Sequence, residues 1–450
     1  MNVLLTACLV LPLAAGTGAT AAAACSGSPS DFDGDGRPDL AVGAPYDDRR
    51  AGSVTVLYGS GREQRLVQDD PEPGDAFGAA LAVGHFDGDR CADLAVGVPD
   101  EFVGERVPGA DGNGVVLLYH GSRGGLRPGQ KLSLAGPSSD RFGAALAAGD
   151  LDGDGRDELA VGAPGLGRGG GVTVYWMKGR EPYRITQRSG WVRQAARATD
   201  GWGETLATGD FDGDGRDELV VGAPADTVTK DGQGSVTVLD PRRRRAVRVT
   251  QSSPGVTGAA EKWDAFGAAL ATGDFDGDGR DDLAIGVPGE GLTAGQRAMD
   301  YGDGALHVLH GTRNGLRGAR SEMWTQRLLK GEPRYYDRFG TSLAAGDFDG
   351  DGNDDLAVGV PGENSVQVMP GSPRGGLSRY GDVRVMRKGG TVSALPAAGG
   401  RPATLVIAAP ADGVVTYVRG VRGGGKALRF GKPRERGSGD GLFGWALAAR

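Results

Sequence analysis

The sequence predicts an all-β fold, a seven-bladed β-propeller whose ring is closed by the two ends of the chain. Three observations predict it: an acidic loop that recurs along the chain, a strand pattern that recurs with it, and ends that supply complementary parts of one unit. The chain has 450 residues, enough for a large repeat domain. Its 83 glycines follow no collagen-like period and indicate many tight turns.

The acidic loop has the form Asp-x-Asp-Gly-Asp-Gly-x-x-(Asp/Glu) and runs into a short apolar strand that ends in Pro. The intact copies start at Asp31, Asp150, Asp210, Asp274 and Asp347. A sixth, damaged copy starts at His85 and has Arg90 where the others have Gly. Upstream of the later copies, an aromatic residue and a glycine open a strand of small residues, at Phe77-Gly78, Phe142-Gly143, Trp202-Gly203, Phe266-Gly267 and Phe339-Gly340.

Each unit continues with the strand after the loop, a variable loop and two further strands, so it holds four short strands in about 60 residues. A seventh, degenerate unit lies near residues 388–440. It keeps the apolar run Leu405–Pro410, but Pro, Ala, Gly and Thr occupy the acidic positions. We therefore expect no metal in the seventh unit.

The two ends of the chain predict that the ring closes. Phe443-Gly444 opens one more first strand, and the sequence stops at Arg450, where the acidic loop would begin. Asp31 begins with that loop at the other end, so the C-terminal strand is expected to complete the first blade. An open solenoid would instead need capping repeats, whereas a closed ring leaves only short sheet edges.

The Phe-Gly and Gly-Ala-Pro frame with its embedded Asp-x-Asp-x-Asp-Gly loop resembles the FG-GAP repeat family, which includes the N-terminal propeller of integrin α subunits. The resemblance covers essentially all of residues 31–450 and is closest in kind to secreted bacterial members. It implies calcium in the loops and partner binding on the opposite face of the ring.

Acids that alternate along a short, glycine-rich loop suit Ca²⁺, which takes six to eight oxygen ligands. We predict carboxylate ligands and one backbone carbonyl, from the seventh position, in each of five sites. The predicted ligands are Asp31, Asp33, Asp35, Arg37 and Asp39; Asp150, Asp152, Asp154, Arg156 and Glu158; Asp210, Asp212, Asp214, Arg216 and Glu218; Asp274, Asp276, Asp278, Arg280 and Asp282; and Asp347, Asp349, Asp351, Asn353 and Asp355.

A metal-free turn, an EF-hand and a magnesium site fit the intact loops less well than calcium does. A metal-free turn would leave close carboxylates to repel one another, an EF-hand needs Glu at the twelfth position between helices, and Mg²⁺ rarely uses an all-protein cage. The damaged loop keeps Asp87, Asp89 and Asp93, and its residues leave metal binding there open.

Residues 1–24 carry no charged side chain, and the apolar run Leu4–Ala15 precedes the small residues Ala22–Ala24. This pattern predicts a secretory signal peptide followed by a propeller over residues 25–450, although the n-region lacks Lys and Arg. A lipoprotein anchored at Cys25 is the alternative. In an oxidising compartment we expect a Cys25–Cys91 disulfide, with two free thiols as the alternative. No later segment is long and apolar enough to span a bilayer.

The loops after Gly-Ala-Pro vary most and should lie on the face opposite the acidic loops, where variable loops on a rigid ring suit recognition. Candidate ligand contacts on that face are Glu101, Phe102, Arg106, Arg297, Met299 and Tyr301. The basic run Arg242–Arg245 is expected to be a solvated hairpin turn or an anionic-ligand contact. We expect a monomer with an extracellular protein or glycan as partner. We expect no nucleic-acid partner, for which the net charge of −8 is no argument either way.

Catalytic motifs are missing from the sequence: there is no Gly-x-Ser-x-Gly elbow and no Walker loop. The histidines His85, His120, His307 and His310 are interpreted as surface or core residues. We therefore predict a binding or adhesion module rather than an enzyme. The alternative is a polysaccharide hydrolase or lyase, which inward-facing His, Lys, Tyr and carboxylates at the central cleft would favour. A smooth, Gly-lined channel with large aromatic loop tips would favour the binding module.

Overall fold

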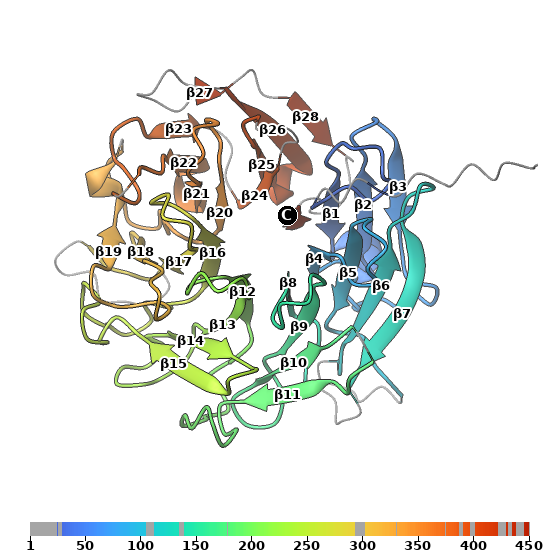
Figure 1. Cartoon of the computed structure of the whole chain (residues 1–450), viewed down its shortest axis with the longest axis horizontal. Coiled ribbons are helices and arrows are strands. Elements are labelled where there is room, and N and C mark those ends of the chain that lie inside the picture. Colours follow the sequence, from blue (N-terminus) through green and yellow to red (C-terminus); the bar gives the residue numbers. More distant parts are fainter. Residues whose placement is uncertain are drawn as a thin grey trace, which may run out of the picture.

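The computed structural model describes residues 25, 29–104, 112–134, 139–177, 179–292, 302–329, 331–373, 375–386, 390–396, 401–421, 429–430, 434–437 and 445–449. Seven antiparallel sheets surround a central axis (Figure 1), which confirms the predicted seven-bladed propeller. Within these ranges, the helices are short turns, and none has the length and apolar character that a membrane crossing requires.

The first four blades follow the predicted units. Blade 1 holds β29 (Ala446–Ala448), β1 (Leu40–Ala44), β2 (Ser53–Leu57) and β3 (Glu63–Leu66). Blade 2 holds β4 (Ala80–Gly84), β5 (Asp93–Val98), β6 (Val115–His120) and β7 (Arg127–Ser133). Blade 3 holds β8 (Ala145–Gly149), β9 (Glu158–Ala163), β10 (Gly171–Tyr175) and β11 (Tyr183–Thr186). Blade 4 holds β12 (Thr205–Gly209), β13 (Glu218–Ala223), β14 (Ser235–Asp240) and β15 (Arg245–Val249).

The remaining blades complete the ring. Blade 5 holds β16 (Ala269–Gly273), β17 (Asp282–Val287), β18 (Ala305–Leu309) and β19 (Glu322–Trp324). Blade 6 holds β20 (Leu343–Gly346), β21 (Asp355–Val360), β22 (Ser365–Met369) and β23 (Val383–Met386). Blade 7 holds β24 (Thr391–Leu395), β25 (Thr404–Ala409), β26 (Val414–Val421), β27 (Arg429–Phe430) and β28 (Arg434–Gly437). The short helical turns are α1 (Asp47–Arg50), η1 (Gln326–Leu328), η2 (Pro361–Glu363) and η3 (Pro410–Asp412).

The C-terminal strand closes the ring as the sequence predicts. β29 pairs antiparallel with β1, with Val42 opposite Leu447. It lies at the inner edge of blade 1, close to the central axis, where Figure 1 also shows the C-terminus. The first blade is therefore built from both ends of the chain.

The Phe-Gly and Gly-Ala-Pro residues hold neighbouring blades together. The aromatic side chains are fully buried, and the Phe266 backbone of blade 5 forms a bridge with Gly234 of blade 4. At Gly97, a Cβ atom would lie 2.1 Å from the carbonyl oxygen of Gly143 in the next blade. Only glycine allows this approach of two backbones, so both motifs serve the packing between blades.

An acid at the eighth loop position, which the repeat motif leaves unspecified, joins each of the loops of blades 3 to 6 to the loop before it. The Asp150 N–H donates to Oδ2 of Asp217 at 3.1 Å, and the Asp217 N–H donates to the Asp150 carbonyl at 3.0 Å. Asp157, Asp281 and Asp354 make the same reciprocal pair with the preceding loop. Hydrogen bonds thus connect the acidic loops from blade 2 to blade 6.

Candidate metal centres and binding surfaces

Each acidic loop lies between the first and second strands of a blade and folds around its own first carboxylate. In blade 3, Oδ1 of Asp150 accepts from the N–H of Gly153 at 2.7 Å, and Oδ2 accepts from the N–H of Gly155 at 2.8 Å. Both glycines have positive φ, 78° and 81°. The alternation of Asp and Gly in the sequence therefore supplies an acceptor and the backbone freedom to curl around it.

The ninth carboxylate is buried and ties the loop to the hairpin between the third and fourth strands. In blade 1, Oδ2 of Asp39 accepts from the Phe32 N–H at 2.8 Å, and Oδ1 accepts from the Gly59 N–H at 2.7 Å. Asp93 and Asp355 make the same two bonds in blades 2 and 6. The loop is thus held in place by backbone donors before any cation is considered.

Predicted ligands converge in the described loops. Groups whose ligand atoms lie within 4.8 Å of one another include Asp31, Asp33 and Asp39; Asp150, Asp152 and Glu158; Asp210, Asp212 and Glu218; Asp274, Asp276 and Asp278; and Asp87, Asp93 and His120. The fifth-position acids, such as Asp154, lie at the exposed rim, where they accept the N–H two residues on. The Arg156 side chain reaches the preceding loop and donates to the Asp87 carbonyl at 3.1 Å.

Burial makes these loops unfavourable as bare anions. Loss of water raises the pKa of Asp39 to about 7, and raises the pKa of Glu158 and Glu218 to about 8. Repulsion from the neighbouring loop carboxylates adds to this effect. Burial likewise raises the pKa of Asp355 to about 8. A bound cation would lower these pKa values again, because it favours the ionised form of every carboxylate around it.

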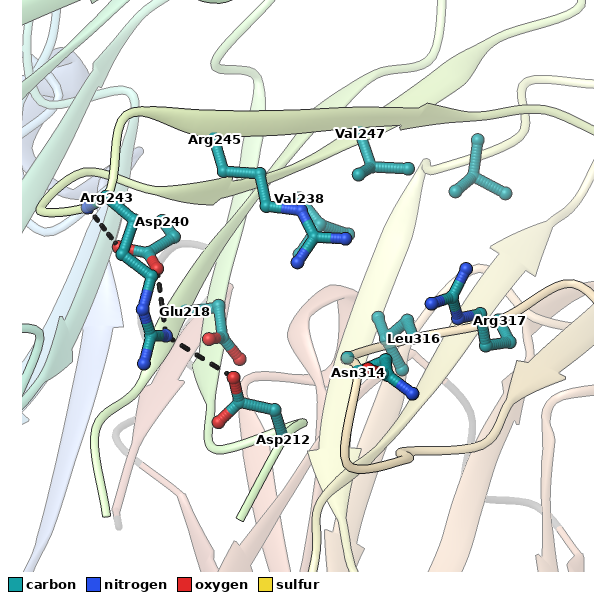
Figure 2. Close-up of a pocket in the computed structure, with 12 residues that line it drawn as sticks. Asp212, Glu218, Val238, Asp240, Arg243, Arg245, Val247, Asn314, Leu316 and Arg317 are labelled. Carbon is teal, nitrogen blue, oxygen red and sulfur yellow. Dashed lines mark hydrogen bonds and ion pairs between the residues drawn. The ribbon is translucent and has the colours of Figure 1, made fainter. Parts of the chain in front are cut away.

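Arginines from neighbouring hairpins approach the third-position acids. Arg62 lies 3.2 Å from Asp33, Arg180 lies 3.0 Å from Asp152, and Arg243 lies 3.3 Å from Asp212. Figure 2 shows Arg243 bound to both Asp212 and Asp240. Part of the basic run at 242–245 is therefore a partner of the acidic loops, a role that neither sequence-based expectation for this run includes.

The same hairpin borders a small pocket between blades 4 and 5, with a volume of about 90 Å³. Val238, Val247 and Leu316 form apolar walls, and Arg245 and Arg317 project over it (Figure 2). The pocket lies on the same face as the acidic loops, since Asp212 and Glu218 also line it.

Two histidines face acidic loops, a position that their interpretation as surface or core residues did not specify. His120 Nδ1 lies 3.5 Å from both Asp87 and Asp93, and His310 Nδ1 lies 3.1 Å from Asp282. A signal for them exists in the sequence, because both residues directly follow the apolar part of the third strand. In the sheet register that position lies opposite the ninth loop residue.

The damaged loop differs from the others at both of its altered positions. The Nδ1 atom of His85 lies 3.5 Å from Oδ2 of Asp157 in blade 3. Arg90 takes φ 75°, the left-handed region that a glycine adopts without strain. The structure joins Cys91 of this loop to Cys25, with Cα atoms 5.0 Å apart, so the N-terminal segment is attached to blade 2.

A channel runs along the centre of the ring and has a volume of about 680 Å³. Small and apolar residues of the first strands line it, together with the charged side chains of Asp347, Asp354 and Arg401. His, Lys and Tyr are absent from the described lining. Gly346 is the one glycine of this described lining, so the channel is not the Gly-lined one expected of a binding module.

On the face opposite the acidic loops, two of the six predicted ligand contacts lie within the described residues. The Glu101 carboxylate is engaged by Gln68 and Lys131, each at 3.2 Å, and Phe102 is half-buried. Arg106, Arg297, Met299 and Tyr301 lie outside the described residues. The large exposed aromatic side chains that the structure adds on this face are Tyr46, Trp263, Tyr335, Tyr336 and Trp445, whereas Tyr380, 73% exposed, lies on the hairpin between β22 and β23, on the acidic-loop face.

These aromatics belong to loops on the face opposite the acids. The N–H of Gly289, which follows the second strand of blade 5, donates to the carbonyl of Asp264 beside Trp263. The N–H of Gly362 in blade 6 donates in the same way to Asp337, beside Tyr336. The spacing before each Phe-Gly motif could have pointed to Trp263 and Tyr336 in the sequence.

The family model for the FG-GAP repeat matches residues 26–57, 77–119, 142–175, 202–239, 266–309 and 339–379, which together make up just over half of the chain. Integrin alpha pat-2 of Caenorhabditis briggsae is 30% identical over 251 residues, covering 52% of this chain and 19% of that protein. Human integrin alpha-IIb is 32% identical over 273 residues, covering 57% and 23%. The phosphatidylinositol-glycan-specific phospholipase D of Rattus norvegicus is 34% identical over 166 residues, covering 32% and 19%.

The chain spans only about a fifth of the length of these relatives. Among solved structures, a Bacteroides uniformis protein proposed to be a 6-phosphogluconolactonase aligns with a TM-score of 0.50 at 11% identity. The alignment covers 92% of this chain and 99% of that chain. At this identity the similarity shows the propeller fold alone.

Proposed function

Because the chain belongs to the FG-GAP repeat family, we propose that it is a secreted, calcium-binding β-propeller that acts as an integrin-α-like binding module. The proposal includes a signal peptide over residues 1–24 and a monomeric propeller over residues 25–450. Its partner would be an extracellular protein or glycan, bound by loops on the face opposite the acidic loops.

The exposed aromatic side chains on that face carry the proposal. Trp263 is 45% exposed and Tyr335 is 51% exposed, although side chains of this size are usually buried in a monomer. Tyr46 and Trp445 pack edge to face with ring centroids 4.9 Å apart, which fixes both rings at the surface. Aromatic residues dominate the energetics of protein interfaces, and a preformed pair binds with little loss of side-chain entropy.

The central channel supports a binding module over a polysaccharide hydrolase or lyase. General acid–base work requires titratable groups within hydrogen-bond reach of a substrate. Two acids and one arginine are the charged residues of the described lining, and both acids have structural contacts. The Asp354 carboxylate accepts the Asp274 N–H, and the Asp347 carboxylate accepts N–H groups of its own loop.

The oxygen-rich acidic loops are the proposed calcium sites. Five loops offer acids that are held by backbone donors and disfavoured as bare anions, and oxygen ligands in flexible number suit Ca²⁺. The ligands would be those predicted from the sequence, with blade 2 the weakest site. Ca²⁺ would neutralise the acidic loops and so make their face of the ring more rigid. That face lies opposite the partner-binding loops.

An array of glycans and secreted proteins, probed with the purified chain in Ca²⁺ and after chelation, tests the function. We expect a binder whose signal falls when Tyr335 and Tyr336 are both changed to Ser, and is kept when the opposite-face residues Arg245 and Arg317 are both changed to Ser. Binding that depends on the arginine pair instead would move the binding surface to the acidic-loop face. Turnover of a polysaccharide by the purified chain would contradict the proposal in favour of an enzyme.

A further inference from the structure

We propose that the acidic loop of blade 5 binds a Zn²⁺-class transition-metal cation, with His310 as a nitrogen ligand beside Asp276 and Asp282. The proposal goes beyond the general calcium assignment and departs from it at this one loop. It depends on the side chains around this site and not on the identity of any binding partner.

His310 is placed over the loop by the sheet register. Leu283 of β17 pairs with Leu309 of β18, so the next residue, His310, lies opposite Asp282. Its Nδ1 is 3.1 Å from Oδ2 of Asp282 and 3.9 Å from Oδ2 of Asp276. Separations of this size are those of ligand atoms that surround one cation at ~2.0–2.2 Å.

The three side chains are buried, and each leaves an atom without a hydrogen bond. His310 is 3% exposed, Asp282 is 1% exposed and Asp276 is 5% exposed. These atoms are His310 Nδ1, Asp282 Oδ2 and Asp276 Oδ1, of which the first two lie 3.1 Å apart and form an ion pair when the histidine is protonated. Buried polar atoms are almost always bonded, so an unbonded oxygen of Asp276 beside this histidine–carboxylate pair indicates a place for a further, positively charged partner.

Asp282, the ninth acid of blade 5, has one carboxylate oxygen that does not accept a backbone N–H and can therefore serve as a metal ligand. In blades 1, 2 and 6, an oxygen of the ninth acid accepts the N–H of the second loop residue. In blades 3 and 5 the corresponding N–H groups, from Leu151 and Phe275, donate instead to the carbonyls of Gly149 and Gly273, and of these two blades only blade 5 has a histidine over the loop. Oδ2 of Asp282 therefore turns to His310, while Oδ1 keeps its bond to the Gly311 N–H at 2.9 Å.

The far side of the imidazole is held by a second carboxylate. His310 Nε2 lies 3.0 Å from Oε1 of Glu322, and Oε2 of Glu322 accepts from Trp324 Nε1 at 2.7 Å. An outer carboxylate that fixes the ring and leaves the other nitrogen toward the site is the usual environment of a metal-bound histidine. The competing role for His310 is that of a cation that replaces metal charge in the loop.

The identity of the donor atom sets the choice of metal. Ca²⁺ takes oxygen ligands, whereas imidazole nitrogen suits Zn²⁺ and related ions. The equivalent positions over the loops of blades 1, 3, 4 and 6 are Tyr58, Trp176, Asp240 and Pro370, which offer no nitrogen lone pair. His120 in blade 2 has such a nitrogen, but its side chain is 29% exposed and its loop lacks the first acid. Blade 2 therefore provides the matched comparison.

The test follows histidine ring nitrogens by ¹⁵N NMR in the full chain, with calcium present in large excess over equimolar Zn²⁺. We expect the Nδ1 resonance of His310 to move to the metal-bound range, while His85 and His307 stay unchanged. Assignment uses His310→Asn. A His310 ring that does not respond to Zn²⁺, or Zn²⁺ that the calcium excess displaces, overturns the proposal and leaves His310 as the charge substitute.

Metal analysis after dialysis provides the second measurement. His310→Asn should lose one Zn²⁺ per chain, and His120→Asn should keep it; the reverse result would place the ion in blade 2 and refute the assignment. Glu322→Gln leaves the His310 ligand in place but removes the carboxylate that fixes its ring, so it should weaken Zn²⁺ binding ~10–100-fold. An unchanged calcium content in these variants shows that they fold, and it separates failure at this loop from failure of the calcium proposal.

Discussion

Removal of calcium should make the stability of this protein strongly dependent on pH. The perturbation acts on the buried ninth acids, of which Glu158 is the clearest because it is 3% exposed and its pKa rises from 4.5 to about 8 without metal. A shift of this size corresponds to at most about 5 kcal/mol when Glu158 is ionised, at ~1.4 kcal/mol per pKa unit. Glu218 and Asp355 shift in the same direction and for the same reason.

The sign follows from proton binding. An unfolded chain ionises Glu158 near pH 4.5, whereas the metal-free folded chain keeps the proton up to about pH 8. Between these values the folded state binds more protons, so metal-free stability should fall as the pH rises, by up to ~1.4 kcal/mol per pH unit for each such acid. With calcium bound, these acids are ionised in both states, and this part of the pH dependence should disappear.

The assay is calorimetric unfolding at several pH values from 5 to 8, on dialysed metal-free protein and on protein saturated with calcium. We expect the difference in Tm between the two to widen steadily toward pH 8. Glu158→Gln should raise metal-free stability at pH 8 and reduce the calcium effect, and Glu181→Gln, on an exposed loop, serves as control. Parallel pH profiles with and without calcium would refute the reasoning.

Three further changes test the construction of the ring. Asp217→Ala removes the acceptor between the loops of blades 3 and 4 and should lower the free energy of unfolding by ~1–3 kcal/mol in urea; an effect no larger than that of exposed Asp70→Ala would contradict the role. Phe266→Ala empties a fully buried site between blades and should lower it by ~3–5 kcal/mol. Cys25→Ser opens a link that spans 66 residues and should lower it by ~2–4 kcal/mol. Peptide mapping that finds Cys25 and Cys91 both free in the wild-type chain would remove the basis of that last expectation.

The repeats carried most of the fold, because each strand pattern occurs several times and errors in one unit are corrected by the others. Ring closure was also predictable, since β29 and β1 are complementary parts of a unit whose length the other copies fix. The loop acids followed from the motif alone. Their convergence could be expected because the first carboxylate and two glycines determine the loop conformation locally.

The residues that were not predicted occupy positions that a repeat motif treats as variable. Asp217 occupies an unspecified loop position, and its role appears only when the loop of the preceding blade is adjacent. His120 ends the third strand of blade 2 and His310 follows the third strand of blade 5, each more than twenty residues from the loop that it faces. Aligning the ends of the third strands on the ninth acid would have brought both histidines into view.

The position at the end of the third strand, opposite the ninth loop acid, shows that loops with the same motif need not have the same chemistry. In blade 4 it holds Asp240, which adds a carboxylate that Arg243 binds together with Asp212. In blade 5 it holds His310, which adds a nitrogen and a link to Glu322. The repeated loop supplies carboxylates of fixed geometry, and a single residue from the third strand adds charge, an arginine partner or a nitrogen donor. Because the third strands vary where the loops do not, divergence in metal affinity among the blades can arise without any change in the acidic motif itself.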